Sequence, residues 1–168
     1  ELLERSKQLE SEDPEVQFLQ EQARQAIEDA EFEKAESLLD KAVELDNAAA
    51  ERLRTNYIER KRSAAESQAL KAESLHTRFA LSDSIESYKL AIQFAEQAED
   101  SGLIAKYQWG IGFVYDDIGK YDQAISSYQD ALDHYLELDG EKSSNVACIR
   151  NNLGNAWRSK GEYDKAIG

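Results

Sequence analysis

The chain has 168 residues, of which 41% are hydrophobic and 32% are charged, and its formal net charge is −14. Such an acidic chain repels phosphate backbones, which argues against nucleic-acid binding, and no apolar run approaches the roughly 18 residues of a membrane-spanning helix. The single cysteine, Cys148, allows no internal disulfide, which favours a cytoplasmic location. One proline and eight glycines in the whole chain favour long helices over a strand-rich fold.

The first helix is predicted to begin at Asp13-Pro14-Glu15. Aspartate is a common N-cap, and proline is tolerated in the first turn of a helix. An acidic residue in the first turn is stabilised by the positive end of the helix dipole. Residues 1–13 are therefore expected to form a separate short helix or a linker, and residues 14–168 a helical repeat domain. The chain begins without a methionine, so we expect it to be a piece of a longer protein.

Two weak repeats follow, over approximately residues 16–46 and 65–99. Small and large residues stand at matching offsets in both, although Phe79 in the second repeat replaces the glycine that later repeats have at their turn. No helix-breaking residue occurs between Asn47 and Thr77, which predicts one unusually long helix there. Basic residues from Arg52 to Arg62 are interpreted as a solvated face of this helix that balances the acidic start of the chain.

The clearest repeat covers residues 104–138 and starts again over residues 146–168. Five positions recur 42 residues apart, pairing Gly112, Tyr115, Gly119, Tyr121 and Ala124 with Gly154, Trp157, Gly161, Tyr163 and Ala166. The small residues leave room for the large ones between two packed helices, and Gly119 is expected to end a helix because glycine readily adopts the left-handed conformation. The last repeat is incomplete, so Leu153 and Trp157 are expected to lack a covering helix and to favour self-association.

These positions resemble the tetratricopeptide repeat, whose motif runs Leu-Gly-x-x-Tyr, Gly-x-Tyr-x-x-Ala, and then an aromatic residue and an alanine. Residues 109–132 match it nearly throughout, with Ile111 for the leucine, while Trp109 stands one place later than the family's tryptophan. The corresponding small residues are 49, 40 and 42 positions apart, which indicates an extended repeat type rather than the usual period of about 34 residues. The resemblance implies an all-α fold, a right-handed superhelix of antiparallel helix pairs known as an α-solenoid.

The resemblance also implies that the first helix of each pair lines a concave groove that binds a partner. On that face the predicted binding residues are Trp109, Phe113, Asp116, Asn151, Asn155 and Arg158. Amide side chains can hold a peptide backbone, a guanidinium can bind a carboxylate through two hydrogen bonds, and exposed aromatic residues are typical anchors. The alternative for Trp109 and Phe113 is core packing against a neighbouring helix, since Ile111, Tyr115 and Ile118 are expected to serve helix pairing.

No constellation of catalytic residues stands out, and neither an enzyme activity nor a cofactor or metal is expected. One helix face does carry possible metal ligands, namely Asp130, Asp133, His134 and Glu137, but a solvated face explains them better because no second cluster completes a coordination shell. The sequence therefore favours a protein–protein interaction module that binds an extended peptide or a partner helix. The alternative is a structural spacer or self-association segment of a larger multidomain signalling protein.

Overall fold

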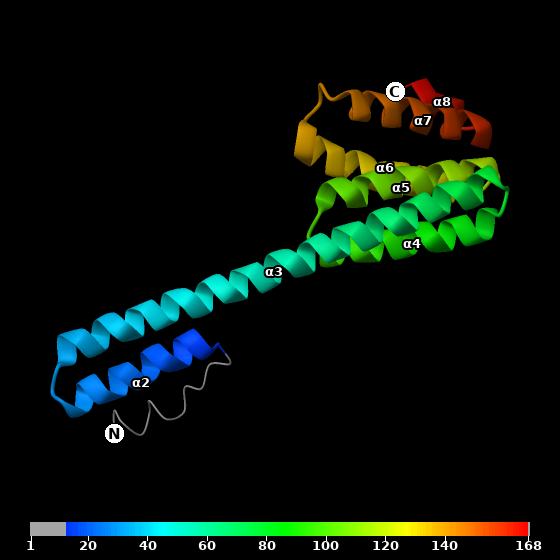
Figure 1. Ribbon diagram of the computed structural model, residues 1–168. Helices are drawn as coiled ribbons and strands as arrows, with labels where there is room; N and C mark the ends of the chain where they lie inside the picture. The colour runs from blue at the N-terminus through cyan, green and yellow to red at the C-terminus, as the bar shows by residue number, and fades with distance from the viewer. Residues whose placement is uncertain (1–12, 168) are drawn as a thin grey trace. The chain divides into compact units, whose positions relative to one another are not determined.

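The computed structural model describes residues 13–167, and its regular elements over this range are all α-helices (Figure 1). The short helix or linker predicted over residues 1–13 lies outside the described residues except for Asp13. The predicted all-helical repeat fold is confirmed, while the hand of the superhelix stays a prediction. In chain order the helices are α2 (Pro14–Glu28), α3 (Phe32–Thr77), α4 (Leu81–Gln97), α5 (Ser101–Asp117), α6 (Tyr121–Asp139), α7 (Ser144–Lys160) and α8 (Tyr163–Ile167).

Helix α2 begins where the sequence predicts. The carboxylate of Asp13 accepts a hydrogen bond from the backbone N–H of Glu15, with a distance of 2.8 Å between the nitrogen and Oδ1. Pro14 follows this N-cap in the first turn, where its missing N–H costs nothing because no intrahelical acceptor is available there. The local sequence is thus sufficient to fix this helix end.

Helix α3 contains the predicted long helix and extends further toward the N-terminus. It has 46 residues and no glycine or proline. The sequence analysis assigns this segment to two helices, the second helix of the first repeat and the first helix of the second repeat. In the structure they form one continuous helix. In its middle, residues 46–56 are exposed apart from the half-buried Ala49.

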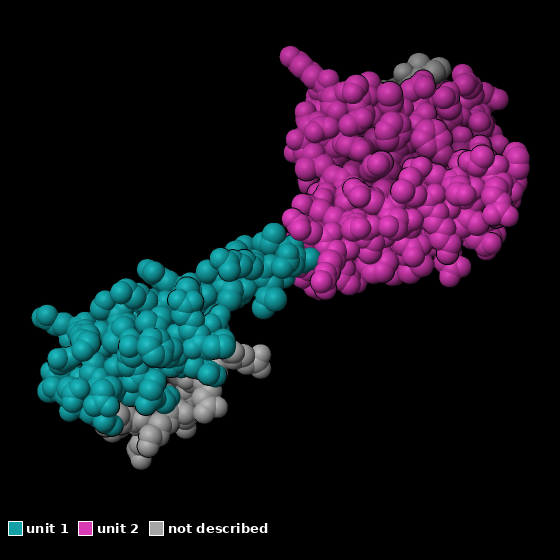
Figure 2. Space-filling model, in the orientation of Figure 1, with its two compact units in different colours: residues 1–56 teal, residues 57–168 magenta. Residues whose placement is uncertain are grey.

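Contacts divide the chain into two compact units, Glu1–Asn56 (unit 1) and Tyr57–Gly168 (unit 2), which Figure 2 shows in different colours. The sequence groups residues 14–168 together, whereas the structure places this division within the exposed part of α3. In the described part of unit 1, α2 packs on α3 through small side chains. The buried residues of this cluster are Ala23, Ala26 and Ala35, with Ile27, Leu38 and Leu39 partly buried against them.

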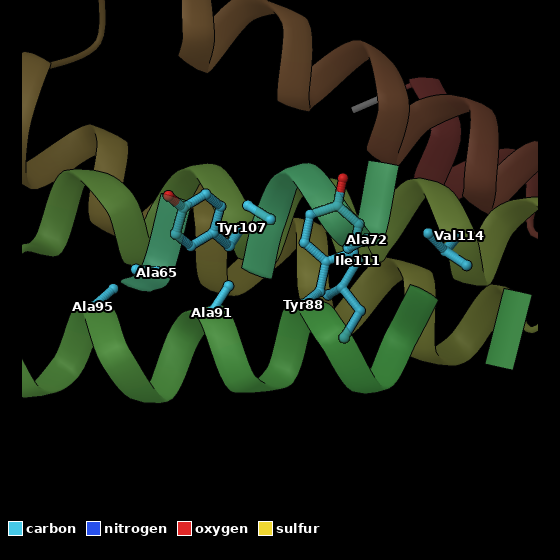
Figure 3. Close-up of a cluster of buried hydrophobic side chains, with 9 residues drawn as sticks. Ala65, Ala72, Tyr88, Ala91, Ala95, Tyr107, Ile111 and Val114 are labelled. Carbon is cyan, nitrogen blue, oxygen red and sulfur yellow. The ribbon is translucent and has the colours of Figure 1, made fainter. Parts of the chain in front are cut away.

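In unit 2, each helix from α4 to α8 packs against the next one along the chain. The last part of α3 contributes Ala65, Ala69 and Ala72 to a core cluster with α4 and α5. Figure 3 shows alanines of α3 and α4 around the rings of Tyr88 and Tyr107. A second cluster joins α6 to α7, and its buried members are Ala124, Tyr128, Ala131, Leu132, Val146, Ile149, Leu153 and Ala156.

Two glycines of α5 each accommodate a tyrosine ring from a neighbouring helix. A Cβ atom added at Gly112 would lie 2.5 Å from Cε1 of Tyr128 on α6, and one added at Gly110 would lie 2.8 Å from Cε1 of Tyr88 on α4. Real Cβ atoms do not approach other atoms so closely. The small-to-large pairing that the sequence predicts for Gly112 is therefore present, and Gly110 makes the equivalent contact with the other neighbouring helix.

The turns after α2, α3, α4, α5 and α7 share one backbone geometry. Each contains a residue with positive φ, and these residues are Ala30 (60°), Phe79 (61°), Glu99 (54°), Gly119 (79°) and Gly161 (88°). The N–H of the following residue donates to the carbonyl five positions earlier, as in the 2.9 Å bonds from Lys120 to Tyr115 and from Ala80 to Leu75. This is the Schellman motif. Gly119 ends its helix as predicted, and Phe79 adopts the left-handed conformation of the glycine that it replaces.

Candidate functional site

The predicted residues of α7 lie together on the wall of one hollow. Asn151, Asn155 and Arg158 line a cavity of about 380 Å³ whose other lining residues are Arg150, Gly154, Tyr163 and Ala166. A guanidinium nitrogen of Arg158, Nη2, donates to Oδ1 of Asn155 at 2.6 Å. Because the three side chains are spaced i, i+4 and i+7, one helix face brings them to the same opening.

Helix α8 forms the other side of this hollow, and charged residues hold it there. Lys160, at the end of α7, lies 2.8 Å from Oδ1 of Asp122 and also pairs with Glu162, just before α8. Hydrogen bonds from Lys160 and Lys165 lower the pKa of the Glu162 carboxyl. Helix α8 packs against α7 beside Gly154, where an added Cβ would make an ordinary van der Waals contact of 3.4 Å with the backbone oxygen of Ala166.

The expectation that Leu153 and Trp157 lack cover is wrong. Leu153 is only 8% exposed and belongs to the core cluster that α6 and α7 share. Trp157 is partly buried against the same cluster, and the ammonium groups of Lys165 and Lys160 lie 4.5 Å and 5.3 Å from the centre of its ring. The preceding helix and two nearby lysines therefore cover side chains that the sequence assigned to a following helix.

The aromatic residues of α5 contact α6, which corrects the expectation that helix pairing does not need them. Trp109 is partly buried. Its ring centroid lies 5.9 Å from that of Phe113, with the rings tilted, and 6.4 Å from that of Tyr135, which it meets edge-on. Phe113 packs edge-on against Tyr128 at 5.8 Å but keeps 42% of its surface exposed. Trp109 therefore packs partly into the core, as the alternative interpretation expects, while Phe113 keeps an exposed face.

The end of α5 gathers negative charge. Burial, and then the neighbouring Asp117, raise the pKa of the Asp116 carboxyl. Burial also raises the pKa of Tyr128, and the charges of Asp116 and Asp117 raise it further. Nε2 of His76, at the end of α3, lies 2.7 Å from Oδ2 of Asp117 and joins the ends of these helices. Sequence reasoning missed this contact, because the two residues lie on different helices and 41 positions apart.

The possible metal ligands on α6 include three exposed carboxylates, Asp130, Asp133 and Glu137. In the described part of the chain, no three His, Cys, Asp or Glu side chains come together as a possible metal site. Asp133, one of the possible ligands on α6, instead accepts a hydrogen bond from Nε2 of Gln129 at 3.2 Å. None of the described helices has both the length and the apolar character needed to cross a membrane.

Comparisons with known proteins support the repeat architecture. Residues 103–168 match the profile of a family described as tetratricopeptide repeat. Among solved structures, the chain is similar to the crystal structure of BtubC (BKLC) from P. vanneervenii, with a TM-score of 0.58 and 22% sequence identity over 99% of this chain and 70% of that one. At this identity the likeness shows the fold alone. No curated protein matches the chain in sequence.

Proposed function

We propose that the chain holds an extended peptide or a partner helix against α5 and α7, as a tetratricopeptide repeat protein does, since residues 103–168 match the profile of that family. Repeats of this family generally mediate protein–protein interaction. The observation that supports the proposal most directly is the hollow on α7, where Asn151, Asn155 and Arg158 converge. Two amides and a guanidinium facing one opening are suited to a peptide backbone and a carboxylate.

Arg158 and Asn155 act together in this proposal. The guanidinium donates to Oδ1 of Asn155, which fixes the orientation of the amide and leaves its NH₂ group to donate to a peptide carbonyl. The other N–H groups of Arg158 can donate to an acidic side chain of the ligand. Replacing Asn155 removes both its own hydrogen bonds and the group that positions Arg158.

The exposed face of Phe113 supplies the apolar part of the proposed site. The ligand therefore carries an apolar anchor for Phe113 and an acidic residue for Arg158. The chain as a whole has a formal charge of −14, so neutral or basic residues beside the anchor favour binding. Association of such a peptide slows as salt rises, because salt screens the long-range attraction.

A random peptide library displayed on phage tests the proposal. Selected peptides are synthesised, and their dissociation constants are measured by isothermal titration calorimetry. We expect Asn155→Ala to weaken binding by about 1–3 kcal/mol, because a bound polar group loses its partner, with little change in melting temperature. Phe113→Ala should also weaken binding. It is a better probe than Trp109→Ala, since Trp109 packs into the core.

The matched control is Asp130→Ala, at an exposed position of α6 outside the hollow. It should leave the affinity of the selected peptides unchanged. Peptides that bind the Asn155 and Phe113 variants as tightly as the unaltered chain would place the binding site elsewhere.

The structural spacer remains a second candidate because of one observation. Helix α3 runs for 46 residues, and its middle is exposed over residues 46–56 apart from the partly buried Ala49. A continuous helix of this kind suits a connecting role. Failure of the library to yield any peptide that depends on Asn155 would favour this function over the binding module.

A further inference from the structure

The end of α5 holds a carboxylate whose charge nothing nearby offsets. Oδ1 of Asp116 is buried and accepts no hydrogen bond from the described residues. Burial, and then the neighbouring Asp117, raise the pKa of the Asp116 carboxyl, and both causes act against its negative charge. Asp117 differs, because its Oδ2 already lies 2.7 Å from Nε2 of His76. A positive group brought to Asp116 would therefore offset an electrostatic cost that the chain itself leaves in place.

The hydroxyl of Tyr128 is a second unpartnered group at the same place. Tyr128 is 1% exposed, yet its hydroxyl finds no hydrogen-bond partner within the described part of the chain. The charges of Asp116 and Asp117 add to the effect of burial in raising the pKa of Tyr128, which places both carboxylates near this hydroxyl. A buried hydroxyl without a partner costs free energy relative to one in water. A ligand group at this position would supply the missing partner.

Phe113 connects these two groups to the proposed binding site. Its ring packs edge-on against that of Tyr128 at 5.8 Å and keeps 42% of its surface exposed. Asp116 follows Phe113 by three positions on α5, so their Cβ atoms lie about 5–6 Å apart on one helix face. In an extended ligand, side chains two positions apart point to the same side and stand about 7 Å from each other. A ligand residue over Phe113 thus brings the residue two positions away to Asp116.

We propose that Asp116 binds a lysine or arginine side chain of the ligand, two positions from the apolar residue that contacts Phe113. Asp116 is only partly buried, which leaves it open to such a group. The cationic group donates one N–H to the Asp116 carboxylate and another to the hydroxyl oxygen of Tyr128. This inference rests on the function proposed above and adds to its recognition chemistry, since Arg158 takes an acidic residue of the ligand and Asp116 a basic one.

Parallel selections from one random peptide library displayed on phage test this specificity. The library is selected on the full unaltered chain, on Asp116→Asn and, as the matched control, on Asp130→Asn, which removes a charge from an exposed position of α6. We expect lysine and arginine two positions from the apolar anchor to be at least about threefold more frequent with the unaltered chain and the control than with Asp116→Asn. Because the two variants have the same net charge, general attraction of basic peptides to an acidic chain cannot produce this difference. Equal frequencies in all three selections overturn the proposal.

Dissociation constants measured by isothermal titration calorimetry isolate the pair of charges. One selected peptide is compared with a counterpart in which glutamine replaces the basic residue. Asp116→Asn should weaken binding of the basic peptide about threefold to tenfold, and that of the glutamine peptide less than about twofold. An equal loss for both peptides would show that Asp116 does not recognise the charge, and it overturns the proposal.

Tyr128→Phe tests the role of the hydroxyl while keeping the ring against Gly112. Since this hydroxyl has no partner among the described residues, its removal should leave the melting temperature of the free chain unchanged or raise it. The basic peptide should nevertheless bind about threefold to tenfold more weakly, because it loses one acceptor. A clear fall in melting temperature would mean that the hydroxyl is already hydrogen-bonded in the free chain, and that result, like unchanged peptide affinity, counts against the proposal.

Asn155→Ala separates this inference from the function on which it rests. Peptides that depend on Asn155 but show no preference for a basic residue beside the anchor overturn the role of Asp116 and leave the proposed function intact. Failure to select any peptide that depends on Asn155 overturns both.

Discussion

At the scale of single residues, the close contact between Gly112 and Tyr128 gives a direct test of the helix packing. A methyl group at Gly112 would lie 2.5 Å from a ring that is itself 1% exposed and has no room to move. Overpacking typically costs about 1–3 kcal/mol, and the better helix propensity of alanine recovers about 1 kcal/mol of it. We expect Gly112→Ala to lower the free energy of unfolding by up to about 2 kcal/mol in urea denaturation.

Gly102, in the first turn of α5, provides the control for this substitution. Its added Cβ would approach only Oδ1 of Asp100, at 3.4 Å. Gly102→Ala should therefore leave stability unchanged or raise it by up to about 1 kcal/mol through helix propensity. Equal effects of the two substitutions would mean that the ring of Tyr128 does not rest on Gly112.

At the scale of helices, local signals predicted much of the fold and the hollow on α7. The cap at Asp13 and the end of α5 at Gly119 depend on residues next to one another, so one sequence is enough to find them. The grouping of Asn151 with Asn155 follows from the period of a single helix. The partial burial of Trp109 was only an alternative in the sequence analysis, because it depends on Tyr135, which lies on the next helix. The pairing of His76 with Asp117 was missed because it spans 41 positions.

Packing of α3, α4 and α5 around two tyrosines predicts a loss of stability in alkali. Burial raises the pKa of Tyr88 and of Tyr107 to about 12, with smaller contributions from nearby carboxylates. Because tyrosines of the unfolded chain titrate near their usual value of about 10, the unfolded state loses these protons first. The free energy of unfolding should therefore fall between about pH 10 and 12, by up to about 1.4 kcal/mol per pH unit for each tyrosine.

Urea denaturation at a series of pH values measures this slope. Tyr107→Phe keeps the ring but removes one titrating group, so its slope should be shallower. Tyr163→Phe, at an exposed position, should reproduce the slope of the unaltered chain. A Tyr107 variant with an unchanged slope would show that this hydroxyl does not contribute to the alkaline transition.

At the scale of the whole molecule, the two units should differ in local stability. Unit 1 buries mainly alanines between its described helices, whereas unit 2 has two clusters with large side chains. Local opening requires less free energy where fewer apolar contacts are broken. Hydrogen exchange followed by mass spectrometry should therefore show faster exchange in α2 and in residues 32–56 than in α4, α5 and α6. Protection in α2 equal to that in α5 and α6 would show that the alanine cluster is as stable as the aromatic ones.

The shared turn geometry has a consequence for how repeats are recognised in sequences. Gly119 and Gly161 lie at turns within the segment that the family profile matches, residues 103–168. At the earlier turns Ala30, Phe79 and Glu99 adopt the same left-handed conformation without glycine. A pattern that requires glycine would therefore detect only the later turns, although the backbone follows one path in all of them. Degenerate repeats can thus be counted more completely from backbone angles than from residue identity.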